Sequence, residues 1–442
     1  MRRLLKLLYP GLGIKRWLVV FAVGFLVASI AGLALILGLP TLRNLIVNII
    51  NRVTTFMDGG HLNLILMFGA GLALMILAGR GFIRTLLLDL APKSEKMVDA
   101  LYQIRSLKRG PRIVVIGGGT GLSTLLRGLK GFTSNLTAVV TVADDGGSSG
   151  ILRGELEMPP PGDIRNCLVA LADTEPLLER LFQHRFQEGG LSGHSLGNLF
   201  LAGMTQILGF QQAVRESGKV LAIRGKVLPV TEENVRLKAT CTDGSIIWGE
   251  SNIGNVDTVI ERLELVPQCQ AISEVLEEIA AADAIVVGPG SLYTSLLPNL
   301  LVGGVVEAMA ASKALKFYVC NIMTQVGETR GYTVADHIQA IHDHVGQGIF
   351  DYALVNNQSV PADMLERYAA EGAEPVKIDW ARLHQMRVKL VADNLLQPGL
   401  VARHAPEGLA RTLLARIAKE SYRPTRILDQ MLLEAQLKNP RK

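Results

Sequence analysis

Two long uncharged hydrophobic runs lie near the start of the chain. Trp17 to Pro40 contains no charged residue, and Leu62 to Gly79 is a second uncharged run. The first run is long enough to cross a hydrocarbon core of about 30 Å, and the second is shorter but still of spanning length. A signal peptide does not fit, because the first run is too long and a second follows it. The pattern predicts a two-helix transmembrane hairpin in residues 1–90, with spans at about 17–40 and 62–79; a pair of buried core helices is the alternative.

Basic residues flank both predicted spans on the same side, whereas the segment between the spans holds only Arg43, Arg52 and Asp58. Because excess Lys and Arg stay in the cytoplasm, we expect both ends inside and a short loop outside. The expected location is the inner (cytoplasmic) membrane, multi-pass, with the rest of the chain in the cytoplasm. The flanking basic residues are Arg2, Arg3, Lys6, Lys15 and Arg16 before the first span, and Arg80, Arg84, Lys93, Lys96, Arg105, Lys108, Arg109 and Arg112 after the second.

The pattern changes after a polar, charged segment bounded by Ala91 and Pro111, which predicts a linker over residues 91–110. The following residues, 111–420, alternate between short buried strands, glycine turns and helices. This alternation predicts βαβ units and an α/β fold with a mostly parallel sheet flanked by helices. Residues 421–442 form a charged tail, either an appended helix or disordered. The predicted strands are Arg112–Ile116, Leu136–Val142, Ala284–Val287 and Leu315–Ile322, with a helix at Leu122–Leu129 and a hairpin closed near Asp243-Gly244.

The net charge divides between the two parts of the chain. Residues 1–112 carry 15 Lys and Arg against 4 Asp and Glu, a net of +11, and the whole chain has +5, so residues 113–442 have −6. The basic character therefore belongs to the membrane flanks, where it suits anionic lipid headgroups. A mildly acidic remainder argues against nucleic-acid binding.

Little in the chain indicates metal or nucleophile chemistry. The four cysteines lie far apart with no CxxC pair, which suits a reducing cytosol and gives no zinc site. There is also no Gly-x-Ser-x-Gly elbow and no cluster of His and Cys ligands.

The segment "GGGTGLS", Gly117 to Ser123, follows a strand and opens a helix. Backbone N–H groups at a helix start can bind an anion, and glycines let a phosphate approach the backbone. The spacing is not GxGxxG, because Thr124 stands where the third glycine would be, and no Walker A lysine follows. The loop is therefore either a phosphate cradle or only a tight turn.

Two adjacent acids, Asp144 and Asp145, end the second predicted strand, and "GGSSG" follows. In a dinucleotide-binding fold, an acid at this position bonds a ribose hydroxyl. The glycines and serines predict a flexible loop of hydrogen-bond donors facing phosphate. The acids would hold a ribose or a divalent ion; the alternative is a pair of solvated turn acids.

Three further segments, "PPPGDIRNC", "GHSLGNL" and "GPGSLYTS", have the same glycine-rich, polar character at strand ends or helix starts. Together they would line one crevice suited to a nucleotide or another phosphorylated ligand. The planar guanidinium of Arg165 can bond two phosphate oxygens, whereas a lone histidine such as His194 is more often structural. The other candidates are Asp163, Asn166, Ser195, Asn198, Gly288, Gly290, Ser291 and Thr294.

Chained motifs covering roughly residues 111–420 resemble the YvcK/CofD family. They are "VVIGGGTGLSTLLRGLK", "VADDGGSSGILR", "PPGDIRNCLVALAD", "GHSLGNL", "VVGPGSLYTSLLPNLLV" and "CNIMTQVGETRGYTVADHI". "RYAAEGAEPV" and "ARHAPEGLARTLL" are similar to the YvcK branch, the gluconeogenesis factors. The resemblance implies a Rossmann-like three-layer fold that binds nucleotide sugars such as UDP-N-acetylglucosamine. It also implies a role in carbon metabolism, cell shape and envelope synthesis. The N-terminal hairpin departs from the usual soluble members.

The resemblance also implies the ligand-binding residues. Gly118, Gly119, Thr120 and Gly121 would cradle phosphate. Asp144 and Asp145 would hold a ribose, or magnesium in a transferase; otherwise no metal is expected. The remaining candidates are Ser148, Ser149 and Asn198 as donors to phosphate or sugar, Gly290, Ser291 and Tyr293 as the facing wall, and Tyr368 and Arg403 for base stacking and phosphate pairing.

Three functions follow, in order of preference. The first is a membrane-tethered, non-enzymatic nucleotide-sugar sensor that needs no cofactor and acts through envelope-synthesis partners, with a homo-oligomer as a further partner. The second is a CofD-type 2-phospho-L-lactate transferase, which moves phospholactyl from a guanosine-diphosphate donor to a deazaflavin with Mg2+. The third is an NAD(P)-dependent oxidoreductase, for which the glycine loop is irregular and no catalytic base stands out.

Overall fold

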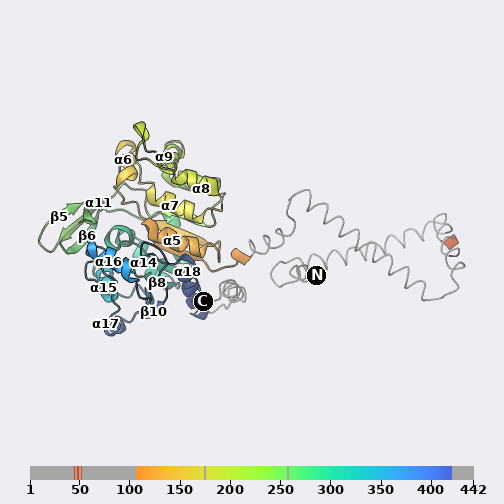
Figure 1. Cartoon of the computed structure of the whole chain (residues 1–442). Helices are drawn as coiled ribbons and strands as arrows, with labels where there is room; N and C mark the ends of the chain where they lie inside the picture. Colours follow the sequence, from red (N-terminus) through yellow and green to blue (C-terminus); the bar gives the residue numbers. More distant parts are fainter. Residues whose placement is uncertain are drawn as a thin grey trace. The chain divides into compact units, whose positions relative to one another are not determined.

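The computed structural model describes residues 106–173, 176–255 and 258–420, together with Asn44, Val47, Asn48 and Asn51 (Figure 1). The chain divides into two compact units, Met1–Ser106 and Leu107–Lys442. Among the described residues, no helix combines the length and apolar character needed to cross a bilayer. Both predicted spans and the tail at 421–442 lie outside the described residues, so the transmembrane hairpin stays a prediction.

A seven-stranded sheet forms the centre of the second unit, in the order β10-β9-β8-β7-β1-β2-β3. Every neighbouring pair in it is parallel, which confirms the mostly parallel α/β sheet. The residues of β1 and β2 are all buried, as expected for central strands covered on both faces. The strands are β1 (Ile113–Gly117), β2 (Leu136–Val140), β3 (Lys226–Pro229), β7 (Ala284–Val287), β8 (Leu315–Val319), β9 (Tyr352–Asn356) and β10 (Lys389–Asp393).

A second, three-stranded sheet has the order β5-β4-β6 and is antiparallel. Its strands are β4 (Arg236–Cys241), β5 (Ile246–Trp248) and β6 (Ile260–Val266). The predicted hairpin around Asp243-Gly244 is confirmed as the connection from β4 to β5. The third strand, β6, was not predicted.

Helices separate the strands along the chain. They are α5 (Gly119–Leu129), α6 (Gly147–Leu156), α7 (Gly162–Leu171), α8 (Pro176–Gln183), α9 (Leu196–Leu208), α10 (Phe210–Val220), α11 (Glu250–Ile253), α12 (Ser273–Ala281), α13 (Leu297–Leu300), α14 (Val305–Ala311), α15 (Val334–Val345), α16 (Ala362–Ala370), α17 (Trp380–Gln385) and α18 (Pro406–Glu420), with a 3₁₀ turn η2 (Gly189–Leu191) and a π-helical turn η3 (Leu292–Leu296).

The helices form two packing groups. In one, α5 contacts α7 and α18, and α10 contacts α9 and β3; in the other, α12 contacts α14 and α13 contacts α15. From β1 the chain adds β2 and β3 on one side and later β7 to β10 on the other. Connections between parallel strands are right-handed, so the helices of connections that run in opposite directions along the sheet lie on its opposite faces. This arrangement is that of a Rossmann-like fold. Figure 1 shows α6, α8 and α9 together, away from α15 and α17.

The predicted flexible loop after Asp145 is wrong. Gly146 is the N-cap of α6, and Gly147 to Gly150 form its first turn. Glycine and serine have low helix propensity. Packing of the buried Ser148 and Ser149 side chains against the rest of the fold outweighs this low propensity. The second strand was predicted to reach Val142, but β2 ends at Val140. Its last hydrogen bond to β1 is donated by the Thr141 N–H to the Gly117 carbonyl at 3.0 Å.

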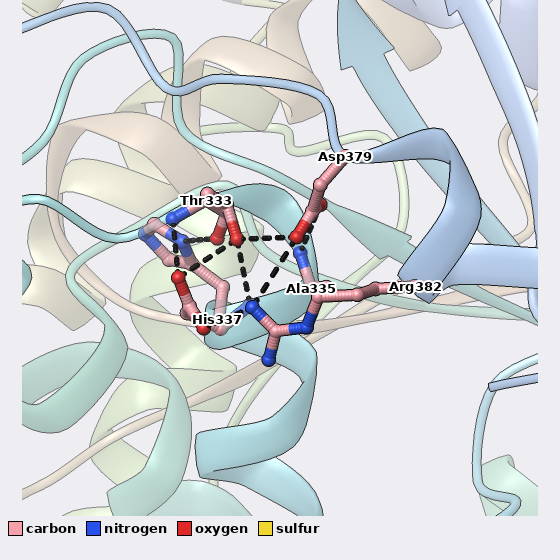
Figure 2. A network of polar contacts seen from close by, with 6 residues as sticks. Thr333, Ala335, His337, Asp379 and Arg382 are labelled. Atoms are coloured by element: carbon pink, nitrogen blue, oxygen red, sulfur yellow. Dashed lines mark hydrogen bonds and ion pairs between the residues drawn. The ribbon is translucent and has the colours of Figure 1, made fainter. Parts of the chain in front are cut away.

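The start of α15 is fixed by polar contacts drawn in Figure 2. Thr333 and Asp336 form a capping box, in which the Thr333 N–H donates to Asp336 Oδ2 at 2.9 Å and the Asp336 N–H donates to Thr333 Oγ1 at 3.2 Å. Asp379, at the start of α17, accepts from the Ala335 N–H at 3.1 Å. Arg382 donates to Asp336 Oδ1 at 2.7 Å, so α17 is tied to α15.

Candidate functional site

Strand order reverses between β1 and β7, which are adjacent in the sheet although β2 to β6 separate them in sequence. Ligands of such sheets bind outside the carboxyl ends of the strands at this reversal. Both strands end in glycine loops there, Gly117–Gly119 after β1 and Gly288–Gly290 after β7. We call the residues at this place, Gly118–Gly121, Asp144, Asp163 and Gly288–Ser291, the switch-point site.

The two glycine loops touch. A Cβ added to Gly121 would lie 2.4 Å from the Pro289 carbonyl oxygen, a backbone atom that cannot move aside cheaply. Gly119 has φ +65°, a left-handed conformation that favours glycine. Asn299 completes the contact, because its Nδ2 donates to the Gly117 carbonyl at 3.0 Å. The glycines are therefore required for the approach of the two helix starts, whether or not a phosphate binds.

The Asp163 side chain is hydrogen-bonded to the first N–H group of α5. Its Oδ2 accepts a hydrogen bond from the Gly119 N–H at 2.7 Å. Burial raises the pKa of the Asp163 carboxyl to about 6, the Gly119 bond opposes this, and the nearby Asp144 carboxylate raises it further. The helix start that was predicted to cradle phosphate thus already binds one internal carboxylate.

Asp144 and Asp145 have different surroundings. Asp144 Oδ1 accepts from the Gly146 N–H at 2.9 Å, which fixes the turn before α6. Asp145 Oδ1 accepts from the N–H of Ser251 at 2.9 Å and from its Oγ at 2.6 Å, which ties α11 to this edge. Glu250 lies against Asp144, and burial followed by the Asp144 carboxylate raises the pKa of Glu250 to about 9. Glu250 is therefore protonated at neutral pH beside the Asp144 carboxyl group.

A polar network joins α6, α7 and α9. Asn198 Nδ2 donates to Ser148 Oγ at 3.0 Å, and Ser148 Oγ lies 3.0 Å from His194 Nδ1. Arg165 donates to Ser195 Oγ and, at 3.0 Å, to Asn198 Oδ1, and its other terminal nitrogen donates to Asn166 Oδ1 at 2.9 Å. The structure thus brings the predicted residues Ser148, Arg165 and Asn198 together, bonded to one another. Ser149 is also buried, against Gly162.

The glycine loop after β7 is hydrogen-bonded to the segment that follows β8. Asn321 Nδ2 donates to the Gly290 carbonyl at 2.9 Å, and Gln325 Nε2 donates to Ser291 Oγ at 2.7 Å. Buried Glu328 accepts from the Tyr293 N–H at 2.9 Å and from Thr294 Oγ1 at 2.9 Å. Tyr293 itself is 1% exposed, with its hydroxyl 3.0 Å from that of Tyr332. Its side chain points into the core behind the loop.

Tyr368 and Arg403 lie in a separate part of the same sheet edge. Tyr368, on α16, packs against a small apolar cluster and accepts from the Ala402 N–H at 3.1 Å, whereas Arg403 is exposed. The cluster follows the carboxyl ends of β8, β9 and β10. Its buried members are Ile322, Met323, Val360, Met364 and Leu396.

The geometry offers no ready metal centre. Within the described ranges, no three His, Cys, Asp or Glu side chains gather in a way that could hold a metal ion. Two cavities lie elsewhere: one of about 310 Å³ between α6 and α9, and one of about 690 Å³ between α17 and β10. Neither is lined by a predicted site residue.

Sequence reasoning missed two carboxyl groups of this region. Glu250 follows Gly249 between the short strand β5 and the four-residue helix α11, and Glu328 lies in a loop, so neither comes after a strand of the parallel sheet as other candidates do. Asp163 was noticed but not selected, and its bond to Gly119 spans 44 residues of sequence. The preceding proline run is the only local signal that such a side chain is held rigidly.

The parallel sheet with paired glycine loops at its switch point defines a Rossmann-like α/β protein. A family model described as "2-phospho-L-lactate transferase CofD" matches residues 113–396. The chain therefore belongs to this family, the YvcK/CofD family indicated by its motifs.

Relatives in the family are similar to this chain over most of their own length. A protein of Halalkalibacterium halodurans named "Gluconeogenesis factor" is 54% identical over 306 residues, 68% of this chain and 95% of that protein. A Nostoc sp. relative, whose name assigns it provisionally to the same group, is 48% identical over 424 residues, 92% of this chain and 91% of that protein. The crystal structure of a Bacillus halodurans protein is 53% identical, covers 69% of this chain and 100% of its own, and has a TM-score of 0.68.

The shares of this chain that the relatives cover show that family members occur in a longer and a shorter form. The Nostoc alignment cannot reach 92% of this chain without including most of residues 1–106. At least one relative therefore shares the N-terminal segment that we expected to depart from the usual members. The Halalkalibacterium protein matches almost completely while covering 68% of this chain.

Proposed function

We propose that this chain is a nucleotide-sugar-binding regulator, with a ligand of the UDP-N-acetylglucosamine type at the switch-point site. In this role it would act as a gluconeogenesis factor of the YvcK branch, in carbon metabolism, cell shape and envelope synthesis. The observation that carries the proposal is the contact between the Gly121 loop and the Pro289 loop at the strand reversal. Such reversals are where sheets of this order bind nucleotides.

Two further observations support the proposal. The relatives named gluconeogenesis factor share about half of their residues with this chain. Arg165 is buried, and its Nε has no partner within the described residues. A phosphate oxygen would supply the missing acceptor and balance a charge that burial destabilises.

Binding of the ligand can be tested on the purified protein. Calorimetry with UDP-N-acetylglucosamine, with and without Mg2+, should give saturable binding in both conditions. A guanosine-diphosphate phospholactate donor with a deazaflavin, and a nicotinamide dinucleotide, serve as the competing ligands. Binding of either competitor with turnover, and no binding of the UDP-sugar, would reject the proposal.

The proposal includes a membrane tether in residues 1–90, based on the two uncharged runs and their basic flanks. A cysteine placed at Asp58 should react with an impermeant thiol reagent in intact cells, and one placed at Ser94 should not. The four native cysteines give little background because all are buried. Reversed labelling of the two positions would contradict a cytoplasmic domain.

A CofD-type transferase is the second candidate, favoured by the description of the matching family model. That activity calls for Mg2+ at the acidic residues. The described carboxyl groups do not fit this role as they stand, since Asp145 bonds Ser251 and no three ligands gather. Formation of a phospholactyl-deazaflavin product by the purified chain would establish this activity directly.

A further inference from the structure

The inference starts from the carboxylate that the chain places at its own phosphate loop. Asp163, in the first turn of α7, reaches across to α5 and accepts from the Gly119 N–H at 2.7 Å. The side chain lies close against the loop, because a Cβ added to Gly118 would be 2.6 Å from Asp163 Oδ2. Any phosphate that binds the remaining N–H groups of the α5 start therefore lies beside a carboxylate.

Burial raises the pKa of Asp163 to about 6, and the nearby Asp144 carboxylate also raises it, whereas the Gly119 bond lowers it. At pH 7.5 Asp163 is thus still mostly ionised, in a part-buried place where water screens its charge less than in bulk solvent. Among the described residues no Lys or Arg forms an ion pair with Asp163, whose hydrogen-bond partners are the Gly119 N–H and the Asn166 side chain.

A separate observation indicates that an anion nevertheless belongs here. Arg165 is 9% exposed, and the partners of its guanidinium among the described residues are the neutral side chains of Ser195, Asn198 and Asn166. Its Nε has no partner in that part of the chain. The site therefore combines a buried cation that lacks a carboxylate at ion-pair distance with a fixed carboxylate at the helix start.

We propose that Asp163 is a specificity-determining residue, which makes the site select a pyrophosphate diester over a nucleotide with a terminal phosphate. This inference rests on the proposed function and concerns which nucleotide the same site accepts. A terminal phosphate has a second ionisation near pH 6, so UDP carries one more negative charge at pH 7.5 than a UDP-sugar. A fixed carboxylate beside the phosphates repels that extra charge, whereas the diester lacks it. Selection by repulsion of the competitor is a common route to specificity.

The test measures a ratio of affinities at pH 7.5 for two probes that differ in one charge, UDP and its terminal methyl ester. The wild-type chain should bind the ester about tenfold more tightly than UDP. Asp163→Asn keeps the side-chain size and an oxygen that can accept from Gly119, but removes the charge. In this variant the ratio should fall to near one, mainly because UDP binds more tightly.

A matched control is Asp173→Asn, which removes an exposed carboxylate that bonds Arg224 outside the site. It should leave the ratio at its wild-type value. If Asp163→Asn fails to fold, as judged by its thermal unfolding curve, the wild-type ratio at pH 7.5 decides alone.

Equal wild-type affinities for UDP and its ester would overturn the inference, as would an unchanged ratio in Asp163→Asn. So would weaker binding of both probes to that variant. Each of these leaves the proposed function standing, provided that UDP-N-acetylglucosamine binds. If the UDP-sugar and both probes all fail to bind the wild type, the proposed function itself is rejected.

Discussion

Asp163 Oδ2 accepts the Gly119 N–H at 2.7 Å, so α5 begins on a carboxylate supplied by α7. The facing helix start repeats this arrangement, since Glu328 accepts the Tyr293 N–H at 2.9 Å. Each helix start at the strand reversal therefore has an N–H group bonded to an internal carboxyl oxygen. A ligand phosphate has to bind beside these two acids rather than at empty helix ends.

Asp144 and Asp145 should respond differently to truncation. Asp144→Ala should weaken UDP-N-acetylglucosamine binding by about 1–3 kcal/mol, the cost of leaving a buried ligand group unpaired, with little change in stability. Asp145→Ala should instead lower the free energy of unfolding by about 1–3 kcal/mol, because it removes both bonds to Ser251. Calorimetry and urea unfolding on both variants separate these effects. Unchanged affinity in Asp144→Ala would contradict its role as the ligand anchor.

Glu250 should make stability depend on pH. Its pKa is about 9 in the folded chain against an ordinary 4.5, so the folded state holds a proton that the unfolded state releases. This contribution to the free energy of unfolding is complete below pH 4.5 and is lost as pH rises toward 9. Glu250→Gln should therefore flatten the decline in stability between pH 5 and 9. Urea unfolding at several pH values measures this slope, and Glu264→Gln, at an exposed Glu that bonds Lys238, should leave it unchanged.

Glu328 should be required for the shape of the second loop. Glu328→Ala leaves the Tyr293 N–H and the Thr294 hydroxyl without their acceptor. We expect a loss of about 1–3 kcal/mol in the free energy of unfolding. Glu328→Gln retains one acceptor oxygen and should lose less. Equal stability of the alanine variant and the wild type in guanidinium unfolding would show that the loop does not depend on this side chain.

Gly121→Ala should separate the two glycine loops. The added methyl group would lie 2.4 Å from a backbone oxygen of Pro289, so the backbone has to shift. We expect a stability loss of about 1–3 kcal/mol from overpacking, together with weaker nucleotide binding. Gly154→Ala is the matched control, since this helix position has nothing within 4 Å. It should gain about 0.5–1 kcal/mol from helix propensity and bind normally.

Removal of residues 1–105 should leave a folded, ligand-binding protein. The second unit begins at Leu107, which is buried and whose carbonyl accepts from the Ser134 N–H at 3.0 Å. A chain starting at Ser106 keeps this contact, and we expect it to unfold cooperatively and retain its affinity for UDP-N-acetylglucosamine. It should lose membrane localisation. If the shortened chain folds but does not bind while the full chain in detergent does, the N-terminal residues take part in the site.

Local pattern was sufficient to predict the parallel sheet and the positions of its glycine loops. Runs such as Ala284–Val287 are continuous and buried, and β1 and β7 each lead directly into a glycine-rich turn. Strands with mixed exposure were missed. For example, β10 lies at the sheet edge and four of its five residues are only partly buried, so no hydrophobic run marks it.

The contacts of the site could not be predicted in the same way. Asp145 was selected as a ligand group, but it bonds Ser251, 106 residues later in the chain. Ser148 and Ser149 were predicted to lie in a flexible loop. In the structure they belong to the helix α6, where both are buried against α7 and α9. A side chain's partner across the fold depends on packing, which spacing along one segment does not contain.

The pairing of β1 with β7 also has a consequence for how the protein is made. Asn299 bonds Gly117 across 182 residues, and Glu328 comes later still. During synthesis, the first glycine loop leaves the ribosome long before its counterpart exists. The proposed ligand site is therefore complete only in chains translated past Glu328, and we expect that a nascent or prematurely terminated polypeptide does not compete for the nucleotide.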